Sequence, residues 1–394
     1  MRLVIDGQRL AANRTGVGRC LESLLKDWSG SGWPLEETLL VVRDPEGLNR
    51  VPSSSGLRTL VVGRNWPGLI WENLGLGRVL RTGDLLFAPA NLVPLTWRGP
   101  TVAVLYDTLP WSVPTSFPWH VRWRFGWRYR LAARRATRVV VPSQSTARDV
   151  ARIHRTPASR VEVVYPGPEP CFRPLLQGSP VVSRARLSVG LRDEPFFLFV
   201  GKRSKRRNVP ALLEAFARHL TRFPEHRLVF VGPDGDAGLS LDSRGVLKGG
   251  HVDEATLHGL YASALGLIYP SDHEGFGLPV VEAQACGCPV ITLANSALVE
   301  SGGNAAYYLA SASVEEMERA LEALSIDHIL RVSLEIRGLE NASRFRCEDF
   351  GEGVKQAIQA VAREFEKLAR PDVCDVLQVR EGESRTGRYP SEIA

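Results

Sequence analysis

The chain has 394 residues, of which 44% are hydrophobic and 23% charged, a composition typical of a soluble globular protein. A chain of this length exceeds what one ordinary core supports, so we expect two domains of roughly 150–200 residues each. No apolar run reaches the ~18 residues of a membrane-spanning helix, and the first residues do not resemble a secretory signal. We therefore expect a cytoplasmic protein.

The net charge of +6 is distributed unevenly. Residues 1–185 carry a net charge of +12, whereas residues 186–394 carry −6. This asymmetry predicts that the two domains face different partners. The six cysteines are scattered apart from Cys286 and Cys288, and no finger-like ligand spacing accompanies that pair. We expect buried, reduced thiols, as in a cytosolic protein.

The first half of the chain alternates strand-like and helical segments. Short runs that are hydrophobic almost throughout predict strands buried on both faces, and they cover residues 2–7, 38–43, 85–90, 101–107, 138–143 and 161–167. Helical patterns lie between several of them, at residues 16–28 and 145–154. Such alternation predicts a parallel sheet with helices on both sides.

The second half repeats this pattern. Strands are predicted at 196–201, 227–232, 265–271 and 288–294, and helices at 209–220 and 253–264. The stretch 173–195 is rich in turn residues and predicts a linker. We therefore expect an α/β fold of two doubly wound units, residues 1–180 and 181–349, with a ligand cleft at the carboxyl ends of the strands. Residues 371–394 are polar and poorly periodic, so we expect a loose tail.

Two carboxylates, Glu274 and Glu282, lie eight positions apart in the stretch HEGFGLPVVEAQACGCPVI. Gly275 and Gly277 free the backbone after a strand, and Pro279 suits the first turn of a helix. Glu282 is then expected in that first turn and Glu274 in the preceding loop. Free N–H groups at a helix start suit phosphate or sugar oxygens, and carboxylates accept hydrogen bonds from hydroxyls. A nucleotide sugar carries both kinds of group.

This stretch closely resembles the E-x7-E signature of the retaining family-4 glycosyltransferases, which have the two-domain GT-B fold of Rossmann-like units. The resemblance implies that Glu282 binds the ribose hydroxyls of a nucleotide sugar. It implies that the donor sugar is held by Glu274, Gly275, Phe276, Gly277 and Leu278. It also implies that a last helix, residues 350–370, crosses back to brace the first domain. A helix start with an acidic residue favoured by the dipole explains Glu282 alone.

A cationic loop follows the predicted strand that ends at Gly201. Five of the six residues from 202 to 207 are Lys or Arg, and such a loop at a sheet edge can neutralise a diphosphate. In the family, Gly-Arg and a later Lys hold this place, so the resemblance implies that Gly201, Lys202 and Arg207 bind the donor diphosphate. Lys and Arg are exchanged here relative to the family, and they differ because Arg binds an oxyanion bidentately.

Two stretches of the first half are expected to face the same cleft. Gly16 and Gly18 open a helix after the first strand, and TGVGR is similar to the opening of bacterial polysaccharide mannosyltransferases of this family. Their amides would approach the donor diphosphate, although a tight turn also explains a G-x-G. Tyr106 and Asp107 end a core strand where the family has His-Asp. Tyr106 can donate a hydrogen bond but cannot become a cation near neutral pH, and a plain core tyrosine is the alternative.

Residues 117–138 contain seven arginines and three tryptophans. Trp119, Trp123 and Trp127 recur every four residues and so share one helix face. In one interpretation these tryptophans pack on the protein's own sheet and the arginines are solvated. In the other, the face binds the anionic inner surface of the cell membrane, because Trp with Arg suits the headgroup region. The membrane-facing residues would then be Trp119, Trp123, Trp127, Arg124 and Arg128.

Asp234, Gly235 and Asp236 have the D-x-D pattern of a metal motif. Asp and Gly are ordinary turn residues after a strand, and the family resemblance implies no metal requirement. We therefore expect neither a metal nor another cofactor. We expect no nucleic-acid partner either, because no binding module is recognisable.

The resemblance implies a retaining glycosyltransferase that moves a hexose from a nucleotide sugar to a glycan or lipid-linked acceptor in bacterial surface polysaccharide or glycolipid synthesis. The TGVGR opening favours GDP-mannose as the donor. No side chain is an obvious nucleophile, and the candidate catalytic residues are Glu274, Lys202, Arg207, Asp107 and Tyr106. The alternatives are a two-carboxylate hydrolase, a sugar-nucleotide epimerase of similar fold, and a catalytically impaired sugar-nucleotide-binding protein.

Overall fold

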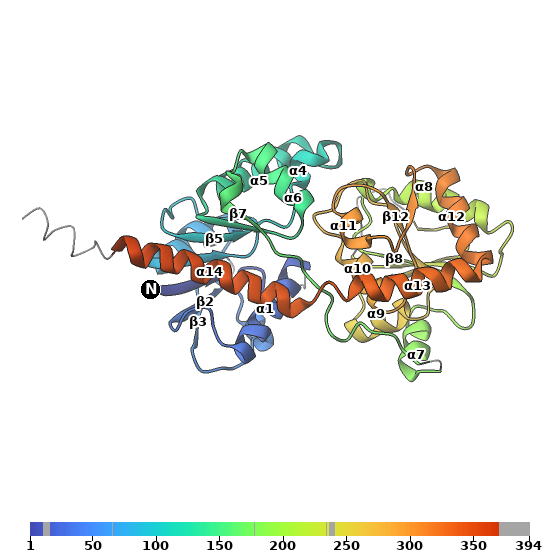
Figure 1. Ribbon diagram of the computed structural model, residues 1–394, viewed down its shortest axis with the longest axis horizontal. Helices are drawn as coiled ribbons and strands as arrows, with labels where there is room; N and C mark the ends of the chain where they lie inside the picture. Colours follow the sequence, from blue (N-terminus) through green and yellow to red (C-terminus); the bar gives the residue numbers. More distant parts are fainter. Residues whose placement is uncertain (11–15, 65, 177, 234, 236–240, 370–394) are drawn as a thin grey trace, which may run out of the picture.

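The computed structural model describes residues 1–394 except residues 11–15, 65, 177, 234, 236–240 and 370–394. It contains two parallel sheets, each in its own α/β domain (Figure 1). The seven-stranded sheet has the order β3-β2-β1-β4-β5-β6-β7, and the six-stranded sheet the order β10-β9-β8-β11-β12-β13. The α/β class and the two doubly wound units predicted from the alternating pattern are confirmed.

The first domain contains the N-terminal half of the chain. Its strands are β1 (Arg2–Asp6), β2 (Thr38–Val42), β3 (Leu57–Val61), β4 (Asp84–Ala88), β5 (Thr101–Val104), β6 (Arg138–Val141) and β7 (Val161–Val163). Its longer helices are α1 (Gly16–Ser31), α5 (Trp119–Arg135) and α6 (Gln144–His154). Its shorter helices are η1 (Pro45–Arg50), α2 (Gly68–Ile70), η2 (Trp71–Leu76), α3 (Gly77–Val79), α4 (Leu109–Ser112), η3 (Pro114–Ser116) and η4 (Ala158–Arg160).

The second domain has the same layered arrangement. Its strands are β8 (Phe196–Val200), β9 (Arg227–Val231), β10 (Val246–Gly250), β11 (Gly266–Tyr269), β12 (Val290–Leu293) and β13 (Tyr307–Leu309). Its helices are α7 (Pro180–Ser188), η5 (Lys205–Arg207), α8 (Val209–His219), α9 (Glu254–Tyr261), α10 (Leu278–Ala285), α11 (Leu298–Gly302), α12 (Val314–Ile326) and α13 (His328–Ala342). The last helix is α14 (Cys347–Ala369).

Three strands that the hydrophobic pattern did not predict are β3, β10 and β13, and each is an edge strand. An edge strand has one unpaired side and less cover, so its sequence is not hydrophobic throughout. In β3, for example, the adjacent residues Arg58 and Thr59 interrupt the apolar run, and four of the five side chains are exposed. The continuous apolar runs therefore predict the central strands and the edge strand β7, and miss the other three edge strands.

The linker predicted at 173–195 is wrong in part, because it contains helix α7. The Ser179 side chain caps this helix by accepting a hydrogen bond from the Val181 N–H, and Pro180 occupies its first turn. Ala185 of α7 is buried in the core of the second domain. The turn residues of this stretch thus begin a helix that belongs to the second domain.

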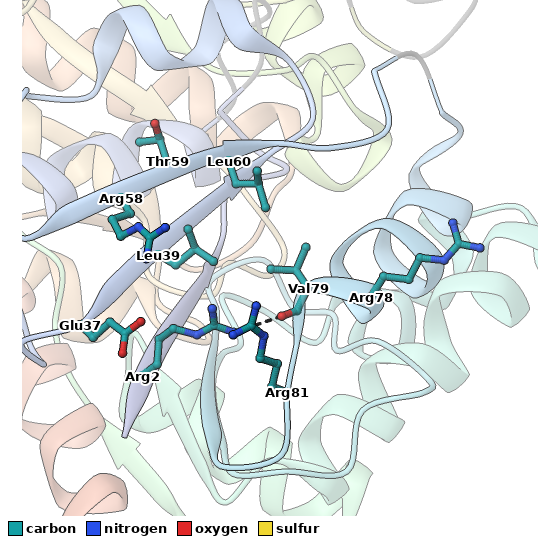
Figure 2. Close-up of a pocket in the computed structure, with 9 residues that line it drawn as sticks. All are labelled: Arg2, Glu37, Leu39, Arg58, Thr59, Leu60, Arg78, Val79 and Arg81. Carbon is teal, nitrogen blue, oxygen red and sulfur yellow. Dashed lines mark hydrogen bonds between the residues drawn. The ribbon is translucent and has the colours of Figure 1, made fainter.

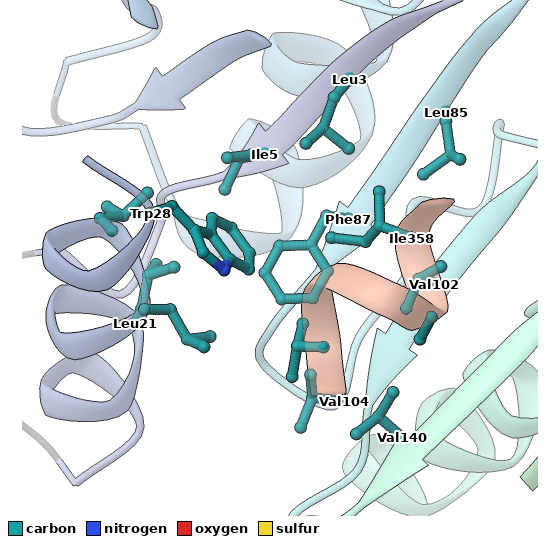
Figure 3. Close-up of a cluster of buried hydrophobic side chains, with 14 of the residues drawn as sticks. Leu3, Ile5, Leu21, Trp28, Leu85, Phe87, Val102, Val104, Val140 and Ile358 are labelled. Atoms are coloured by element: carbon teal, nitrogen blue, oxygen red, sulfur yellow. The ribbon is translucent and has the colours of Figure 1, made fainter. Parts of the chain in front are cut away.

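Helix α14 leaves the second domain and packs on the first. Its apolar residues Val354 and Ile358 lie in the same buried cluster as Trp28 and Phe87 (Figure 3). The indole Nε1 of Trp28 donates a hydrogen bond of 3.0 Å to the Gly351 carbonyl on this helix. The helix that the family resemblance implied for residues 350–370 therefore begins at Cys347 and contributes to the core of the first domain.

The chain passes between the domains twice, after β7 and again between α13 and α14. The two connections touch at Gly167, where an added Cβ would lie 2.3 Å from the carbonyl carbon of Arg346. No side chain fits at that distance, so glycine permits this close approach.

Candidate functional site

Glu274 lies at the centre of a buried polar cluster at the carboxyl end of β11. Its Oε1 accepts hydrogen bonds from Arg206 Nη1 at 2.5 Å, Tyr269 Oη at 2.7 Å, Ser271 Oγ at 3.0 Å and Arg207 Nε at 3.2 Å. All four donors converge on this one oxygen. Within the described residues the other oxygen, Oε2, has no hydrogen-bond partner, so it is available to accept a bond from a ligand hydroxyl.

The charge of Glu274 follows from these contacts. Burial alone would raise the pKa of the carboxyl group, but the guanidinium groups of Arg207 and Arg206 outweigh burial and lower this pKa to about 2. Glu274 is therefore a fixed anion at neutral pH and not a proton donor.

The cationic loop after β8 supplies the two arginines that contact Glu274. Gly201 has a φ of 123°, and an added Cβ there would lie 2.0 Å from Arg207 Nη1. The same Nη1 donates a hydrogen bond of 3.0 Å to the Lys202 carbonyl, and the guanidinium lies 5.1 Å from the Tyr269 ring centroid. Arg207 is thus buried as a partner of Glu274, whereas the Lys202 side chain is exposed.

Arg206 is a site residue that the sequence reasoning missed. The resemblance assigned the charge of the loop to Lys202 and Arg207 alone. In the structure Arg206 Nη1 also donates to Ser271 Oγ and to the His273 carbonyl, each at 2.8 Å. The only signal available in the sequence was the density of positive charge from 202 to 207.

Glu282 faces a different set of partners. It lies in the second turn of α10, which begins at Leu278, and not in the first turn as predicted. Its Oε2 accepts a hydrogen bond of 3.1 Å from Tyr261, and its Oε1 lies 3.4 Å from Arg19 Nη2 of the first domain. Burial raises the pKa of Glu282, and Arg19 opposes that rise. In this arrangement Arg19 occupies a position where a ligand hydroxyl would bind the carboxylate.

The loop from Glu274 to α10 meets the first domain directly. An added Cβ at Gly275 would lie 1.7 Å from the Tyr106 carbonyl oxygen, so only glycine fits here. The Gly275 carbonyl accepts hydrogen bonds from Ser143 Oγ at 2.7 Å and Thr146 Oγ1 at 3.0 Å. Phe276 is buried against Tyr165 and Phe345, so its ring packs in the protein and does not line the site.

The remaining predicted residues of this loop shape the helix start. Gly277 has a φ of 95°, in the left-handed region that favours glycine, and it directly precedes Leu278. The chain can therefore turn sharply from Glu274 into α10.

The predicted residues of the first domain line the opposite wall. Asp107 accepts a hydrogen bond of 3.1 Å from the Leu109 N–H, and burial raises its pKa while Arg206 opposes that rise. The Tyr106 hydroxyl lies against Cys20, and burial raises its pKa well above the usual value. Gly16 begins α1, and Gly18 is buried in its first turn. These residues come from the loop after β5 and from the start of α1, which face Glu274 and Glu282.

Further hydrogen bonds hold the two domains together. Glu300 of α11 accepts from the Ser145 N–H at 2.7 Å, the Gln144 N–H at 2.8 Å and Tyr165 Oη at 3.0 Å. The two amides belong to the first turn of α6, where the helix dipole favours an anion. A cavity of about 30 Å³ between the domains, lined by Arg19, Glu282 and neighbours, is far smaller than ligand pockets of roughly 300–1,000 Å³. This particular cavity is too small to hold a nucleotide sugar.

The tryptophan helix α5 differs from one of the two predictions made for it. Trp119, Trp123 and Trp127 are 78%, 72% and 39% exposed, so the interpretation that they pack on the sheet is wrong. Arg128 was predicted to face a membrane, but it is buried in an ion pair with Glu72. Its position on the opposite side of the helix from the tryptophans explains this. The backbone of Arg124 lies on α5, and its side chain is outside the described part.

The remaining sequence motifs are the Asp-Gly-Asp stretch at 234–236 and the cysteine pair. Asp234 and Asp236 lie outside the described residues. Within the described part of the chain, no group of three His, Cys, Asp or Glu side chains could hold a metal ion. Cys286 and Cys288 are buried free thiols, and burial raises the pKa of Cys288 to about 12. No helix in the described ranges is long and apolar enough to cross a membrane.

Both domains match family models of one class of enzyme. Residues 16–170 match the family model described as glycosyltransferase family 4, and residues 187–340 match the model described as glycosyl transferases group 1. The two matches cover one α/β domain each. The chain belongs to the glycosyltransferases with the GT-B fold.

Parts of two curated glycosyltransferases are similar in sequence to this chain. The chain is 31% identical over 163 residues to O-antigen chain mannosyltransferase B of Escherichia coli, covering 39% of this chain and 43% of the relative. It is 32% identical over 222 residues to D-inositol 3-phosphate glycosyltransferase of Mycobacterium tuberculosis, covering 52% of this chain and 43% of the relative. The chain thus matches less than half the length of these relatives.

Solved structures agree in fold. Anabaena HepE in complex with UDP-glucose aligns with a TM-score of 0.69 and 19% identity, covering 93% of this chain and 100% of that one. WaaG, a glycosyltransferase involved in lipopolysaccharide biosynthesis, aligns with a TM-score of 0.69 and 16% identity, covering 90% and 99%. At these identities the likeness concerns the fold.

Proposed function

We propose that this protein is a retaining glycosyltransferase that moves a hexose from a nucleotide sugar to a glycan or lipid-linked acceptor. The observation that carries the proposal is the arrangement around Glu274. Four donors bind its Oε1 and keep it charged, while Oε2 is left for a sugar hydroxyl. Glu282, placed on the next helix, is suited to the ribose of the same ligand.

The proposed reaction needs no side-chain nucleophile. The bond between the anomeric carbon and the diphosphate breaks, and the acceptor oxygen bonds to that carbon on the same face. The departing diphosphate takes the acceptor's proton, so atoms and charge balance. Lys202 and the amides at the start of α10 stabilise the charge that develops on the diphosphate, and Glu274 positions the sugar. We assign Asp107 to the acceptor, because it lies in the first domain opposite Glu274.

We further propose GDP-mannose as the donor and bacterial surface polysaccharide or glycolipid as the product. The support is the TGVGR opening and the similarity to O-antigen chain mannosyltransferase B. A thermal-shift panel of GDP-, UDP- and dTDP-sugars tests this choice. GDP-mannose should give the largest rise in melting temperature, and a larger rise with a UDP-sugar would contradict it.

Replacing Glu282 tests the ribose assignment. Glu282→Ala removes hydrogen bonds to a charged acceptor worth roughly 1.5–3 kcal/mol each, so we expect donor affinity to fall by about tenfold or more. Titration calorimetry with the best donor from the panel measures the loss.

Glu254→Ala is the matched control for this experiment. Glu254 lies 3.7 Å from the same Arg19 but is partly exposed and is not assigned to the donor. Equal losses in both variants would show that the effect acts through Arg19, and unchanged affinity in Glu282→Ala would remove the ribose assignment.

One observation favours a second candidate, a sugar-nucleotide-binding protein without transferase activity. Tyr106 replaces the histidine of the family, and its hydroxyl, with a raised pKa, cannot supply a cation near neutral pH. Nucleotide release with an acceptor present distinguishes the two, because a binding protein releases none. For an active enzyme, the anomeric configuration of the product, measured by NMR, tests retention.

We propose that the exposed face of α5 associates with an anionic membrane. Trp119→Ala/Trp123→Ala should reduce co-sedimentation with phosphatidylglycerol vesicles several-fold, because the aromatic rings leave water on binding. These side chains are mostly exposed, so stability should change by less than about 0.5 kcal/mol. Undiminished co-sedimentation of the folded variant would contradict membrane binding by this face.

A further inference from the structure

A second cavity lies in the first domain, away from the cleft between the domains. Its volume is about 330 Å³, within the range of small-molecule sites. Figure 2 shows its lining: Arg2 from β1, Leu39 from β2, Arg58, Thr59 and Leu60 from β3, Arg78 and Val79 from α3, and the nearby Glu37 and Arg81. None of these residues belongs to the proposed donor site.

The cavity exists because the edge of the sheet is incompletely covered. The helical segment from α2 to α3 is short and returns to β4 without covering β3. Leu60 on β3 is therefore 40% exposed, and together with Leu39 and Val79 it forms an apolar floor. A parallel sheet is normally covered on both faces, so an open floor of this kind is unusual.

The rim of the cavity is strongly basic. Arg2 is bound to Asp84 by hydrogen bonds of 2.6 and 3.0 Å and to the Val79 carbonyl at 3.1 Å, and the Asp84 bond raises its pKa. In the described part of the chain, the side chains of Arg58, Arg78 and Arg81 form no hydrogen bond or ion pair.

The balance of charge around the cavity is positive. Apart from the Arg2–Asp84 pair, the three remaining arginines face a single acidic lining residue, Glu37. Arg78 points away from the other labelled side chains, so Arg58 and Arg81 are the cations placed to meet a ligand (Figure 2). Like charges that outnumber their counter-charges repel one another, and a bound anion relieves that repulsion.

We propose that this cavity binds a phosphate ester through Arg58 and Arg81, with Arg2 held in place by Asp84. Guanidinium groups bind phosphate oxygens bidentately. The apolar floor accommodates the carbon part of the ester. A soluble phosphate ester and the phosphodiester of a lipid headgroup both carry the anionic oxygens that such a cavity would bind.

The site is separate from the proposed donor cleft. Arg2 begins β1 and Arg81 precedes β4, so the cavity lies near the amino ends of these strands. Glu274 instead faces the carboxyl-end loop after β5, which contains Tyr106 and Asp107. Phosphate binding at the two places can therefore be removed independently.

The experiment is titration calorimetry of the full chain with inorganic phosphate and with glycerol phosphate. Arg58→Ala/Arg81→Ala should weaken saturable binding at one site by at least about tenfold, because two charge-assisted contacts are lost. Arg98→Ala/Arg160→Ala removes the same charge from exposed positions on the same domain and should leave this binding unchanged. Thermal unfolding of each variant confirms that it is folded.

Two further measurements show where the ligand binds and whether its source is soluble or a lipid. Lys202→Ala/Lys205→Ala weakens the donor loop and should leave the cavity's binding intact. Binding of vesicles of phosphatidylcholine with phosphatidylglycerol that depends on Arg58 and Arg81 indicates a lipid source, and binding of glycerol phosphate alone a soluble one. The proposal is overturned if no saturable binding occurs, if only the donor-loop variant loses it, or if the exposed-arginine control loses as much.

Discussion

Glu274→Gln is expected to abolish most sugar transfer while leaving nucleotide binding largely intact. The amide keeps the shape of the carboxylate but removes the charge that Arg206 and Arg207 hold in place. Loss of a preorganised group at the reacting sugar costs roughly 10²–10³ in kcat. Single-turnover kinetics and donor titration measure the two effects, and equal losses in kcat and nucleotide affinity would falsify the sugar contact.

The pH dependence of stability tests the charge of Glu274 separately from catalysis. The folded-state pKa of about 2 lies below the ordinary value of 4.5, so the ionised group stabilises the fold above pH 4.5. That stabilisation, a few kcal/mol, is lost as the pH falls through about 2. The difference in unfolding free energy between wild type and Glu274→Gln should therefore be constant above pH 4.5 and shrink below it. A difference that grows on acidification would contradict the assigned charge.

Arg128→Ala is expected to lower the free energy of unfolding by about 3–5 kcal/mol. Arg128 is 6% exposed and Glu72 only 1%, so the substitution leaves a buried carboxylate without its counter-charge. Burial already raises the pKa of Glu72, and Arg128 opposes that rise. Without Arg128 the pKa rises further, so the variant should recover stability as the pH falls and lose it as the pH rises. Chemical denaturation at several pH values measures this.

Two variants serve as controls for Arg128. Trp119→Ala changes the exposed face of the same helix and should alter stability by less than about 0.5 kcal/mol. Glu72→Leu/Arg128→Met replaces the whole pair by apolar groups and should be close to wild type. If the double variant is as unstable as Arg128→Ala, packing of the arginine stem and not its charge holds this site together.

The sequence predicts the centre of this fold better than its margins. Strands buried on both faces, such as β8 with Phe196 and Phe199, are hydrophobic throughout and are recognisable without a structure. Edge strands such as β3 need only one paired side and can carry Arg58 and Thr59. Helix α7 was not predicted, because the Ser179-Pro180 pair at its start is equally typical of a turn.

The candidate site was likewise predictable from the sequence only in part. Glu274 and Glu282 are visible as a spaced motif in a glycine-rich turn. Which cation each of them contacts depends on how elements far apart in the sequence pack together. Neither the Arg206–Glu274 contact nor the Arg19–Glu282 contact could therefore be predicted from the spacing. The periodicity of α5 placed the three tryptophans together, but only the packing shows that they face outward and that Arg128 faces inward.

The contact between Gly167 and Arg346 has a mechanical consequence. Both crossings of the chain pass through this one place, so any rotation of one domain against the other has its axis close to it. Rotation about such an axis separates Glu300 from α6 and Arg19 from Glu282 at the same time. Glu274 keeps its contacts with Arg206 and Arg207, because all three belong to the second domain. Under the proposed function, a donor sugar enters and leaves during this rotation while the hydrogen bonds around Glu274 stay intact.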